Sequence, residues 1–297
     1  MNNMPLVSVC TLAYNHAPYI RECLDGILMQ KTNFVFELLI HDDASTDGTA
    51  DIIREYEAKY PDIVKPIYQT ENQYSKGVKI SSTYQFSRAK GKYIAMCEGD
   101  DYWTDPLKLQ KQVDFMEANP EYSLCFHNAK VIYQDEDKES HIFANIEDRE
   151  YRGEELINKF LIPTASALFT EKAKNEYISR AYNPNYSYAD LVIWLSCYEV
   201  GKIRGINENM SIYRRNKGSV SYYPRANDIR MKQVIEFSND FNSKYWEYVK
   251  DEIAEYYILM GISKIFYEKN FSGFKLIFKG LRITTKPLFK FIKSKLI

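Results

Sequence analysis

Two short acidic segments are the parts of this sequence best suited to chemistry. EGDD occupies residues 98–101 and HDDASTDGT occupies residues 41–49, each directly after an apolar run. Adjacent carboxylates repel one another, so one pKa rises or a divalent cation with hard oxygen ligands is recruited. Mg²⁺ or Mn²⁺ bridging to a diphosphate would fit such a site. Alternatively, Asp105 and Pro106 start the next helix and Asp100 only caps a turn.

Asp42 ends the apolar run that precedes the first acidic segment. Its carboxylate could accept hydrogen bonds from the N–H edge of a nucleobase. Asp43 or Ser45 could equally cap the next helix, and capping is the role expected of Asp47. We favour binding for Asp42, because its strand end is expected to share a crevice with Thr11 and Asn15.

The frame that positions these residues follows from the alternation of patterns. Strands are expected at residues 5–12, 37–43, 63–68 and 91–97, and helices at residues 18–29, 45–60 and 75–90. This alternation is typical of an α/β fold with a largely parallel sheet and helices on both faces. Ligands gather at the carboxyl ends of such strands, where the sequence puts Tyr14, Asn15, Asp42, Asp43, Asp100 and Asp101.

The second half of the chain continues the α/β pattern and then becomes helical. Helices are expected at residues 105–120, 153–161, 171–181 and 189–202, with strands at 123–134, 164–169, 202–206 and 210–215. Beyond about residue 224 the pattern is that of long helices, at 225–242 and 246–268. We therefore expect a domain at residues 1–222 and a helical extension at residues 223–297.

The composition is that of a globular protein. The chain has 297 residues, of which 45% are hydrophobic and 27% charged, so it can bury a sizeable core. Five cysteines without CxxC spacing suit buried thiols in a reducing compartment. The N-terminus does not resemble a signal peptide, and no long apolar window predicts a spanning helix. We expect a cytoplasmic protein whose membrane contact, if any, is peripheral.

Charge is distributed unevenly along the chain. The net charge is −1, but residues 272–297 contain seven Lys and Arg and no acid, which leaves −8 for residues 1–271. A helical face of Phe274, Ile277, Phe278 and Leu281 between these cations suits an anionic membrane surface. Packing on the acidic domain or on a partner protein is the alternative, and nucleic acid is not an expected partner.

The ordered motifs SVCTLAYNHAPYI, LLIHDDASTDGT, GKYIAMCEGDDYW and ADLVIWL resemble those of the family 2 glycosyltransferases over roughly residues 6–221. The resemblance implies the GT-A fold, a nucleotide-sugar donor and a divalent cation, Mg²⁺ or Mn²⁺. It implies that Asp42 holds the base, commonly uracil, in a nucleotide pocket lined by Thr11, Ala13, Tyr14 and Asn15. Asp100 would face the ribose or the metal. Asp101 would be the metal-bound carboxylate of a DxD-like motif that begins here with Glu98.

The same resemblance implies that Asp190 is the catalytic base. A carboxylate within ~3 Å of an acceptor hydroxyl accepts its proton as the hydroxyl attacks the anomeric carbon, giving inversion. An ordinary helix N-cap is the alternative for Asp190, and both roles are compatible. Relatives often carry a His after YR, where this chain has Asn216, and Arg214, Arg215 or Lys217 could bind phosphate.

The function expected from this sequence is that of an inverting, metal-dependent glycosyltransferase. We expect it to move a sugar from a UDP-sugar to a glycan or lipid-linked glycan at the inner face of the cell membrane, in surface polysaccharide biosynthesis. A sugar-nucleotide nucleotidyltransferase is the first alternative, although its Gly-rich basic N-terminal loop is missing here. A receiver-like Mg²⁺-binding module is the second, but it is far shorter than this chain and leaves YADLVIW unexplained.

Overall fold

The computed structural model describes residues 4–158, 160–180, 183, 186, 189–216, 233–236 and 245–284. The chain divides into two compact units. The first consists of Met1–Pro184 and Ala189–Tyr222, and the second of Asn185–Tyr188 and Tyr223–Ile297.

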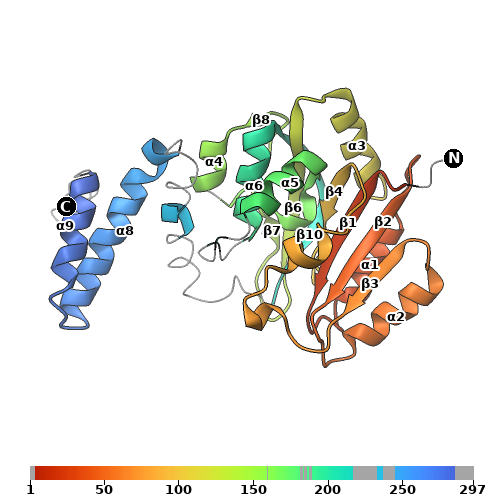
Figure 1. Cartoon of the computed structure of the whole chain (residues 1–297), viewed down its shortest axis with the longest axis horizontal. Helices are drawn as coiled ribbons and strands as arrows, with labels where there is room; N and C mark the ends of the chain where they lie inside the picture. Colours follow the sequence, from red (N-terminus) through yellow and green to blue (C-terminus); the bar gives the residue numbers. More distant parts are fainter. Residues whose placement is uncertain are drawn as a thin grey trace. The chain divides into compact units, whose positions relative to one another are not determined.

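A parallel half-sheet forms the first part of the larger unit (Figure 1). Its strands are β1 (Val7–Ala13), β2 (Phe36–Asp42), β3 (Val64–Tyr68) and β4 (Tyr93–Met96), in the spatial order β3-β2-β1-β4. β-Branched and aliphatic residues dominate β1 and β2, and every residue of β2 is buried, as expected for strands covered on both faces. Ala13 pairs with Asp42, so the last residues of β1 and β2 lie at one edge of the sheet.

The second half of the sheet is mixed, which differs from the largely parallel sheet predicted. β9 (Leu168–Thr170) runs antiparallel between β4 and β6 (Tyr122–Tyr133), whereas β6 and β10 (Lys202–Arg215) are parallel. β5 (Tyr102–Trp103) and β8 (Glu150–Tyr151) pair antiparallel with β10, and β7 (His141–Ile142) with β6. The two short strands expected at 202–206 and 210–215 are one strand, because register shifts at residues 206–211 carry β10 through the polar segment between them.

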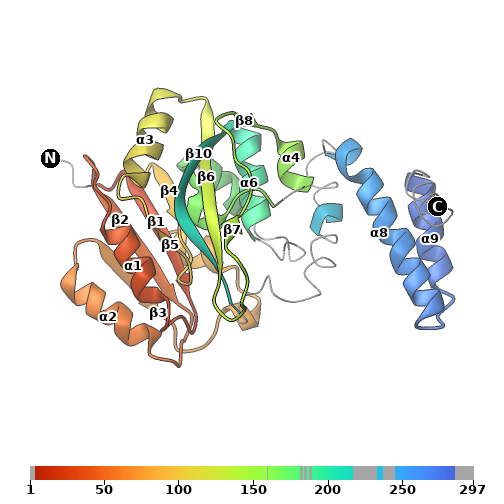
Figure 2. The same cartoon turned by 180° about the vertical axis from the view of Figure 1, so that it is seen from behind.

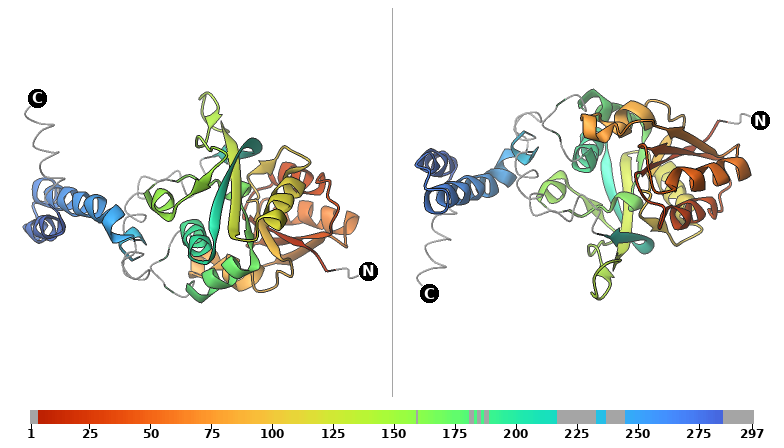
Figure 3. Two further views of the ribbon diagram at one scale, coloured as in Figure 1. Left: turned by 90° about the horizontal axis from the view of Figure 1, so that it is seen from above. Right: turned by 90° about the horizontal axis from the view of Figure 1, so that it is seen from below.

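Helices cover both faces of the sheet (Figures 2 and 3). α1 (Ile20–Leu28), α2 (Thr49–Lys59) and α3 (Lys108–Ala118) lie on one face, and they bury Leu24, Ile53 and Val113 against the strands. α4 (Gly153–Asn158), α5 (Glu171–Arg180) and α6 (Ala189–Val200) lie on the other, with a 3₁₀ turn, η3 (Thr164–Ser166), before β9.

The helix predicted at residues 75–90 does not form as one element. The segment contains a 3₁₀ turn, η1 (Tyr74–Lys76), and a π-helical turn, η2 (Ser81–Gln85). Gly77 between them has φ +79°, a left-handed conformation that ends the first turn. The backbone N–H groups of Gln73 and Tyr74 donate to the Asp43 carboxylate, so the segment is fastened to the end of β2.

The described part of the smaller unit contains two long helices, α8 (Trp246–Phe266) and α9 (Gly273–Ile283), which lie side by side (Figures 1 and 2). The basic segment expected at residues 272–297 is described only as far as residue 284, and most of the helix expected at 225–242 also lies outside the described residues. Among the helices that are described, none has the length and apolar character needed to cross a bilayer.

An ionisable side chain is buried in the core beneath the acidic loop. Lys108, in the first turn of α3, is fully buried, and its Nζ lies 4.0 Å from the Trp103 ring centroid. Nζ also donates to Gln112 Oε1 at 2.7 Å. Burial lowers the pKa of Lys108 to about 7, because the charged form loses its hydration.

This burial predicts a pH-dependent stability. Between about pH 7 and the ordinary lysine pKa of ~10.4, the unfolded chain holds a proton that the folded chain has lost, so the free energy of unfolding rises with pH. The cost of Lys108 is fully present below about pH 7 and disappears toward ~10.4, a change of several kcal/mol. Lys108→Met should lack this rise in urea denaturation across that range, whereas a variant of the exposed Lys90, Lys90→Met, should keep it. Parallel pH profiles for wild type and Lys108→Met would contradict the assignment.

Candidate active site

The loops that follow β1 and β2 are joined by a series of hydrogen bonds. Asn15 donates its backbone N–H to Ser45 Oγ at 2.9 Å, and its Oδ1 accepts from the N–H of Thr46 at 2.9 Å. Asn15 has φ 54°, a left-handed conformation that Asn tolerates better than most residues. Asn15 was predicted to contact the nucleotide. Two of its polar groups instead join the loop after β1 to the loop after β2.

Asp47 and Asp43 occupy the roles of scaffold residues. The Asp47 carboxylate accepts from the backbone N–H of Thr49 and of Ala17, so it caps the start of α2, as predicted. Asp43 accepts from Gln73 and Tyr74 instead of capping α2. The neighbouring carboxylates of Asp42 and Asp43 thus have different hydrogen-bond partners.

Buried acceptors at the ends of β1 and β2 remain without partners. Asp42 is 2% exposed; its Oδ2 accepts a long hydrogen bond from Ser45 N–H at 3.3 Å, and its Oδ1 has no partner. Thr11, fully buried, also has an unpartnered Oγ1. Leaving a buried polar atom unsatisfied costs roughly 1–3 kcal/mol, which a ligand donor would recover. Ala13 is buried beside them, and Tyr14 is about half exposed at the rim.

The acidic loop is attached to β10 by a buried backbone contact. Asp101 is 2% exposed, and its Oδ1 accepts from the backbone N–H of Arg214 at 2.8 Å. Burial, and then the charge of Asp100, raise the pKa of Asp101 well above its ordinary value. The Asp101 carboxylate, predicted as a metal ligand, is therefore turned into the protein.

Asp100 differs from Asp101 in both exposure and partner. It is partly exposed, and its Oδ2 accepts from Nδ2 of Asn216 at 3.1 Å. Asn216 stands where relatives of the resembled family often have His, and its side chain reaches the acidic loop. Of the two adjacent carboxylates, Asp100 is therefore the more exposed.

Arg214 was predicted to bind the nucleotide sugar, and the structure gives its side chain other partners. Nε donates to the Asp100 carbonyl oxygen at 2.9 Å and Nη1 to Gln134 Oε1 at 2.9 Å. Nη2 pairs with Glu22, and the guanidinium lies 4.8 Å from the Tyr19 ring centroid. With 6% of the residue exposed, this cation holds the acidic loop in place, and we no longer assign it to phosphate binding. Of the other two phosphate candidates, Arg215 is exposed at the end of β10, and Lys217 lies outside the described residues.

The charge of Asp190 acts on a carboxyl group of the acidic loop. Burial, and then the charges of Asp100 and Asp190, raise the pKa of Glu98 to about 8. Burial likewise raises the pKa of Asp190, although the Leu191 backbone N–H opposes the shift by donating to Asp190 Oδ1 at 2.7 Å. The charge of Asp190, from a distant part of the chain, therefore acts on the same carboxyl group as the charge of Asp100 in the acidic loop.

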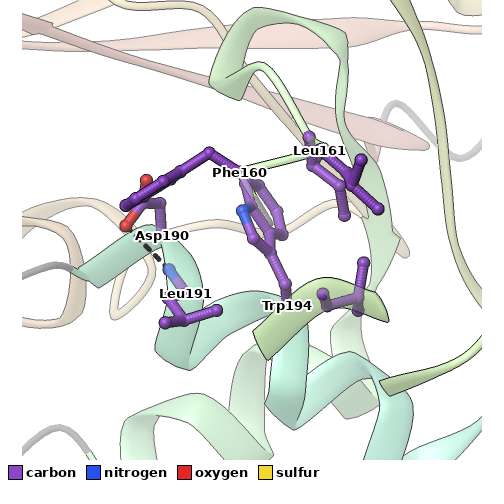
Figure 4. Close-up of a pocket in the computed structure, with 7 residues that line it drawn as sticks. Phe160, Leu161, Asp190, Leu191 and Trp194 are labelled. Carbon is purple, nitrogen blue, oxygen red and sulfur yellow. Dashed lines mark hydrogen bonds between the residues drawn. The ribbon is translucent and has the colours of Figure 1, made fainter. Parts of the chain in front are cut away.

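A small pocket lies beside Asp190 on the same unit (Figure 4). Apart from the Asp190 carboxylate its lining is apolar, and it consists of Leu156, Phe160, Leu161, Ile162, Leu191 and Trp194. Asp190 stands in the first turn of α6, where the helix dipole favours a carboxylate. Asp190 is the second residue of α6 and not its N-cap, and one of its carboxylate oxygens accepts from the N–H of the next residue, Leu191.

A divalent cation would find few protein ligands here. Within the ranges that the structure describes, no three His, Cys, Asp or Glu side chains gather into a metal-binding group. Mg²⁺ commonly takes one or two carboxylates and completes its shell with substrate phosphates and water. Asp100, with the Asn216 amide beside it, fits that pattern.

Sequence reasoning missed two residues of this site, Glu22 and Gln134. Both reach Arg214, from α1 and from just beyond β6. Their positions carry no motif, since each is an ordinary polar residue on a surface element. Only the fold, which brings residues 80 and 192 positions apart into contact, identifies them.

Comparisons with known proteins agree with these motifs. The model of Glycosyl transferase family 2 matches residues 8–177. TuaG of Bacillus subtilis, a putative teichuronic acid biosynthesis glycosyltransferase, is 32% identical over 74% of this chain and 83% of its own length. WfaP of Escherichia coli is 30% identical over 81% of this chain and 87% of its own. It is named a UDP-Glc:alpha-D-GlcNAc-diphosphoundecaprenol beta-1,3-glucosyltransferase.

A further relative is longer than this chain. An uncharacterized protein of Mycobacterium tuberculosis is 39% identical over 210 residues, which cover 71% of this chain and 59% of that protein. The chain therefore spans less than two thirds of this relative.

Solved structures share the fold. TarS of Staphylococcus aureus, in complex with UDP-GlcNAc, has a TM-score of 0.62 at 18% identity, covering 97% of this chain and 81% of its own. The mannosyltransferase PcManGT from Pyrobaculum calidifontis, in complex with GDP-Man and Mn²⁺, has a TM-score of 0.53 at 16% identity, covering 97% and 88%. The predicted GT-A fold is confirmed, with the mixed sheet and C-terminal helices described above.

The contacts of Arg214 predict a large effect of a charge-conserving change. Arg214→Lys keeps the cation but cannot join the Asp100 carbonyl, Gln134 and Glu22 at once, so the buried side chain at position 214 loses hydrogen bonds. We expect the free energy of unfolding to fall by about 1–3 kcal/mol. The adjacent exposed Arg215 is the control, and Arg215→Lys should change it by less than about 0.5 kcal/mol in the same urea titration. Equal effects at both positions would contradict the scaffold role.

Proposed function

The chain belongs to Glycosyl transferase family 2, and on that premise we propose that it transfers a sugar from a nucleotide diphosphate, most simply UDP, to a glycan or lipid-linked glycan. The observation that best supports the proposal is that β2 and β4 flank β1 in parallel, so Asp42 and the loop with Asp100 follow strands that end at one edge of the sheet. Residues 1–222 are proposed as the catalytic domain and residues 223–297 as a helical extension.

The nucleotide would bind at the ends of β1 and β2. The unpartnered Asp42 Oδ1 supports a contact with a base N–H, and the unpartnered Thr11 Oγ1 supports a second polar contact nearby. Tyr14, half exposed at the rim, offers a ring face to the base or ribose. A complex of TarS contains UDP-GlcNAc, which is consistent with a UDP-sugar donor in this fold.

The diphosphate would meet the acidic loop. We assign Asp100 as the carboxylate ligand of Mg²⁺ or Mn²⁺, with Asn216 beside it, and we assign Asp101 to holding the loop against β10. When bound, the cation would supply positive charge for the departing diphosphate. The structure of PcManGT is a complex with GDP-Man and Mn²⁺, which is consistent with a divalent cation accompanying the donor.

Asp190 is proposed as the general base. Asp190 lies beyond residues 8–177, which the family model matches. Its assignment therefore rests on the effect of its charge on the pKa of Glu98 and on the pocket beside it. One oxygen accepts from the Leu191 N–H, which fixes the direction of the carboxylate, and the other is available to an acceptor hydroxyl. Removal of that proton as the hydroxyl attacks the anomeric carbon would give inversion.

The acceptor would be a growing surface polysaccharide or its lipid-linked precursor. WfaP acts on a diphosphoundecaprenol-linked sugar, and TuaG is named for teichuronic acid biosynthesis. A lipid-linked acceptor would bring the reaction to the cytoplasmic face of the cell membrane. The apolar wall of the Asp190 pocket is suited to the apolar face of a sugar ring.

Calorimetric titration with UDP, GDP and dTDP, each with and without Mn²⁺, tests the donor site. We expect one diphosphate to be preferred and to bind at least ~10-fold more tightly with the cation. Asp100→Asn should lose the cation's contribution, whereas Asp62→Asn, at an exposed position on the same unit, should keep it. Absence of diphosphate binding under every condition would overturn the proposed function. A cation effect that survives in Asp100→Asn but is lost in a folded Asp101→Asn would instead reverse the two carboxylate roles.

The role of Asp190 is tested by kinetics. Asp190→Asn should lower kcat by about 10²–10⁴-fold, the usual contribution of a general base, and leave UDP affinity unchanged. Because burial raises the pKa of Asp190, the base is lost as pH falls through a value above the ordinary ~3.9 of an aspartate. The acid limb of the kcat profile should therefore lie above that value, and a wild-type rate retained by Asp190→Asn would remove Asp190 from the mechanism.

A further inference from the structure

The helical hairpin of α8 and α9 is packed through glycines. A Cβ added to Gly261 on α8 would lie 2.5 Å from the Gly273 carbonyl oxygen and 2.6 Å from Ile277 Cγ1 on α9. A Cβ on Gly280 would lie 2.7 Å from the Ala254 carbonyl oxygen. The two backbones are therefore in direct contact, and α9 faces α8 with Gly273, Ile277 and Gly280.

This packing leaves the large aromatic side chains outside. The end of α8, the turn and α9 expose five aromatic residues, with exposed fractions from 48% to 85%: Phe266, Tyr267, Phe271, Phe274 and Phe278. The Phe271 and Phe274 rings are stacked, with centroids 6.5 Å apart. A water-soluble hairpin normally buries such residues at the helix contact, whereas helices in lipid pair through small residues. The α8–α9 hairpin follows the pattern of helices in lipid, because glycines lie at its contact and the aromatic residues lie outside.

The sequence prediction for α9 is corrected by the same observation. Phe274, Ile277, Phe278 and Leu281 were expected to form one apolar face, but Ile277 packs toward α8 while Phe274 and Phe278 face outward. The outward surface also presents Lys275, Lys279 and Arg282. Phenylalanines and cations therefore share one face of the helix.

The charge of this segment indicates which partner the exposed face can bind. Residues 264–284 contain five cations, Lys264, Lys269, Lys275, Lys279 and Arg282, and a single acid, Glu268. A second copy placed on the same face would bring like charges together, at an energetic cost. An anionic lipid surface supplies the opposite charge, and its interface accepts aromatic rings.

We propose that the aromatic and basic face of the α8–α9 hairpin lies on an anionic lipid bilayer, with the rings of Phe271, Phe274 and Phe278 in the headgroup region. Neither helix is long and apolar enough to span a bilayer, so the hairpin lies on the surface. The proposal is independent of the donor chemistry and would hold for any acceptor. It deepens the proposed function by bringing the enzyme to the surface that carries lipid-linked sugars.

The test is sedimentation of the full chain with phosphatidylcholine vesicles, with and without phosphatidylglycerol. Wild type should bind vesicles containing phosphatidylglycerol, and binding should fall with added salt. Each cation is worth about fivefold in affinity, so Lys275→Gln, Lys279→Gln and Arg282→Gln together should cost about 100-fold. The matched control removes three exposed lysines from the larger unit, as Lys31→Gln, Lys59→Gln and Lys90→Gln, and should leave binding unchanged.

The aromatic contribution is tested separately. Phe274→Ser with Phe278→Ser should lower vesicle affinity at least ~10-fold, whereas Phe278→Trp should retain it, because Trp partitions well to the interface. Circular dichroism and donor hydrolysis should be unchanged in these variants. Absence of binding to either vesicle type would overturn the proposal. A lipid-free dimer in ultracentrifugation that Phe274→Ser and Phe278→Ser dissociate would overturn it too, by assigning the face to a second copy.

Discussion

The hydrogen bond from the backbone N–H of Arg214 to the buried Asp101 carboxylate is the contact on which the candidate site depends. It joins β10 to the loop after β4, more than 100 residues earlier in the chain. A backbone donor fixes the carboxylate in direction as well as distance, which a flexible side-chain donor does less well. The side chain of the same residue then binds the Asp100 carbonyl, Gln134 and Glu22, so β6 and α1 are tied to the loop by one guanidinium.

This arrangement gives two adjacent aspartates different properties without any difference in residue type. Asp101 is surrounded by protein, and its pKa is raised by burial, whereas Asp100 reaches the crevice and meets Asn216. The same separation occurs one loop away. Asp43 is committed to the backbone of residues 73 and 74, and Asp42 keeps one oxygen without a partner. In each pair one carboxylate fixes the backbone so that its neighbour can face a ligand.

The parallel strands and the acidic segments at their ends could be predicted from the sequence, because they depend on residues close together in the chain. Apolar runs gave the parallel strands β1 to β4, and strand ends followed by acids indicated the crevice. The roles of Asp100, Asp101 and Arg214 could not be separated, because they depend on which side chain turns inward, and that is decided by contacts with β10. Ile277 was grouped with the phenylalanines of α9 on one face, and the sequence could not show that it packs toward α8. Helical periodicity gives the face of a residue, but the close approach at Gly261 decides which face packs.

The contact of Asp190 with the Leu191 N–H is compatible with its proposed role as the general base. Its Oδ1 accepts from the first-turn N–H of Leu191, and this contact together with the helix dipole stabilises the charged carboxylate. The apolar wall of Phe160, Leu161 and Trp194 acts in the opposite direction and raises the pKa. A base that is held in position by one oxygen and made more basic by its surroundings is better suited to accept a proton than a solvated aspartate. In the proposed mechanism the contact with the Leu191 N–H would supply the orientation, and burial would supply the basicity.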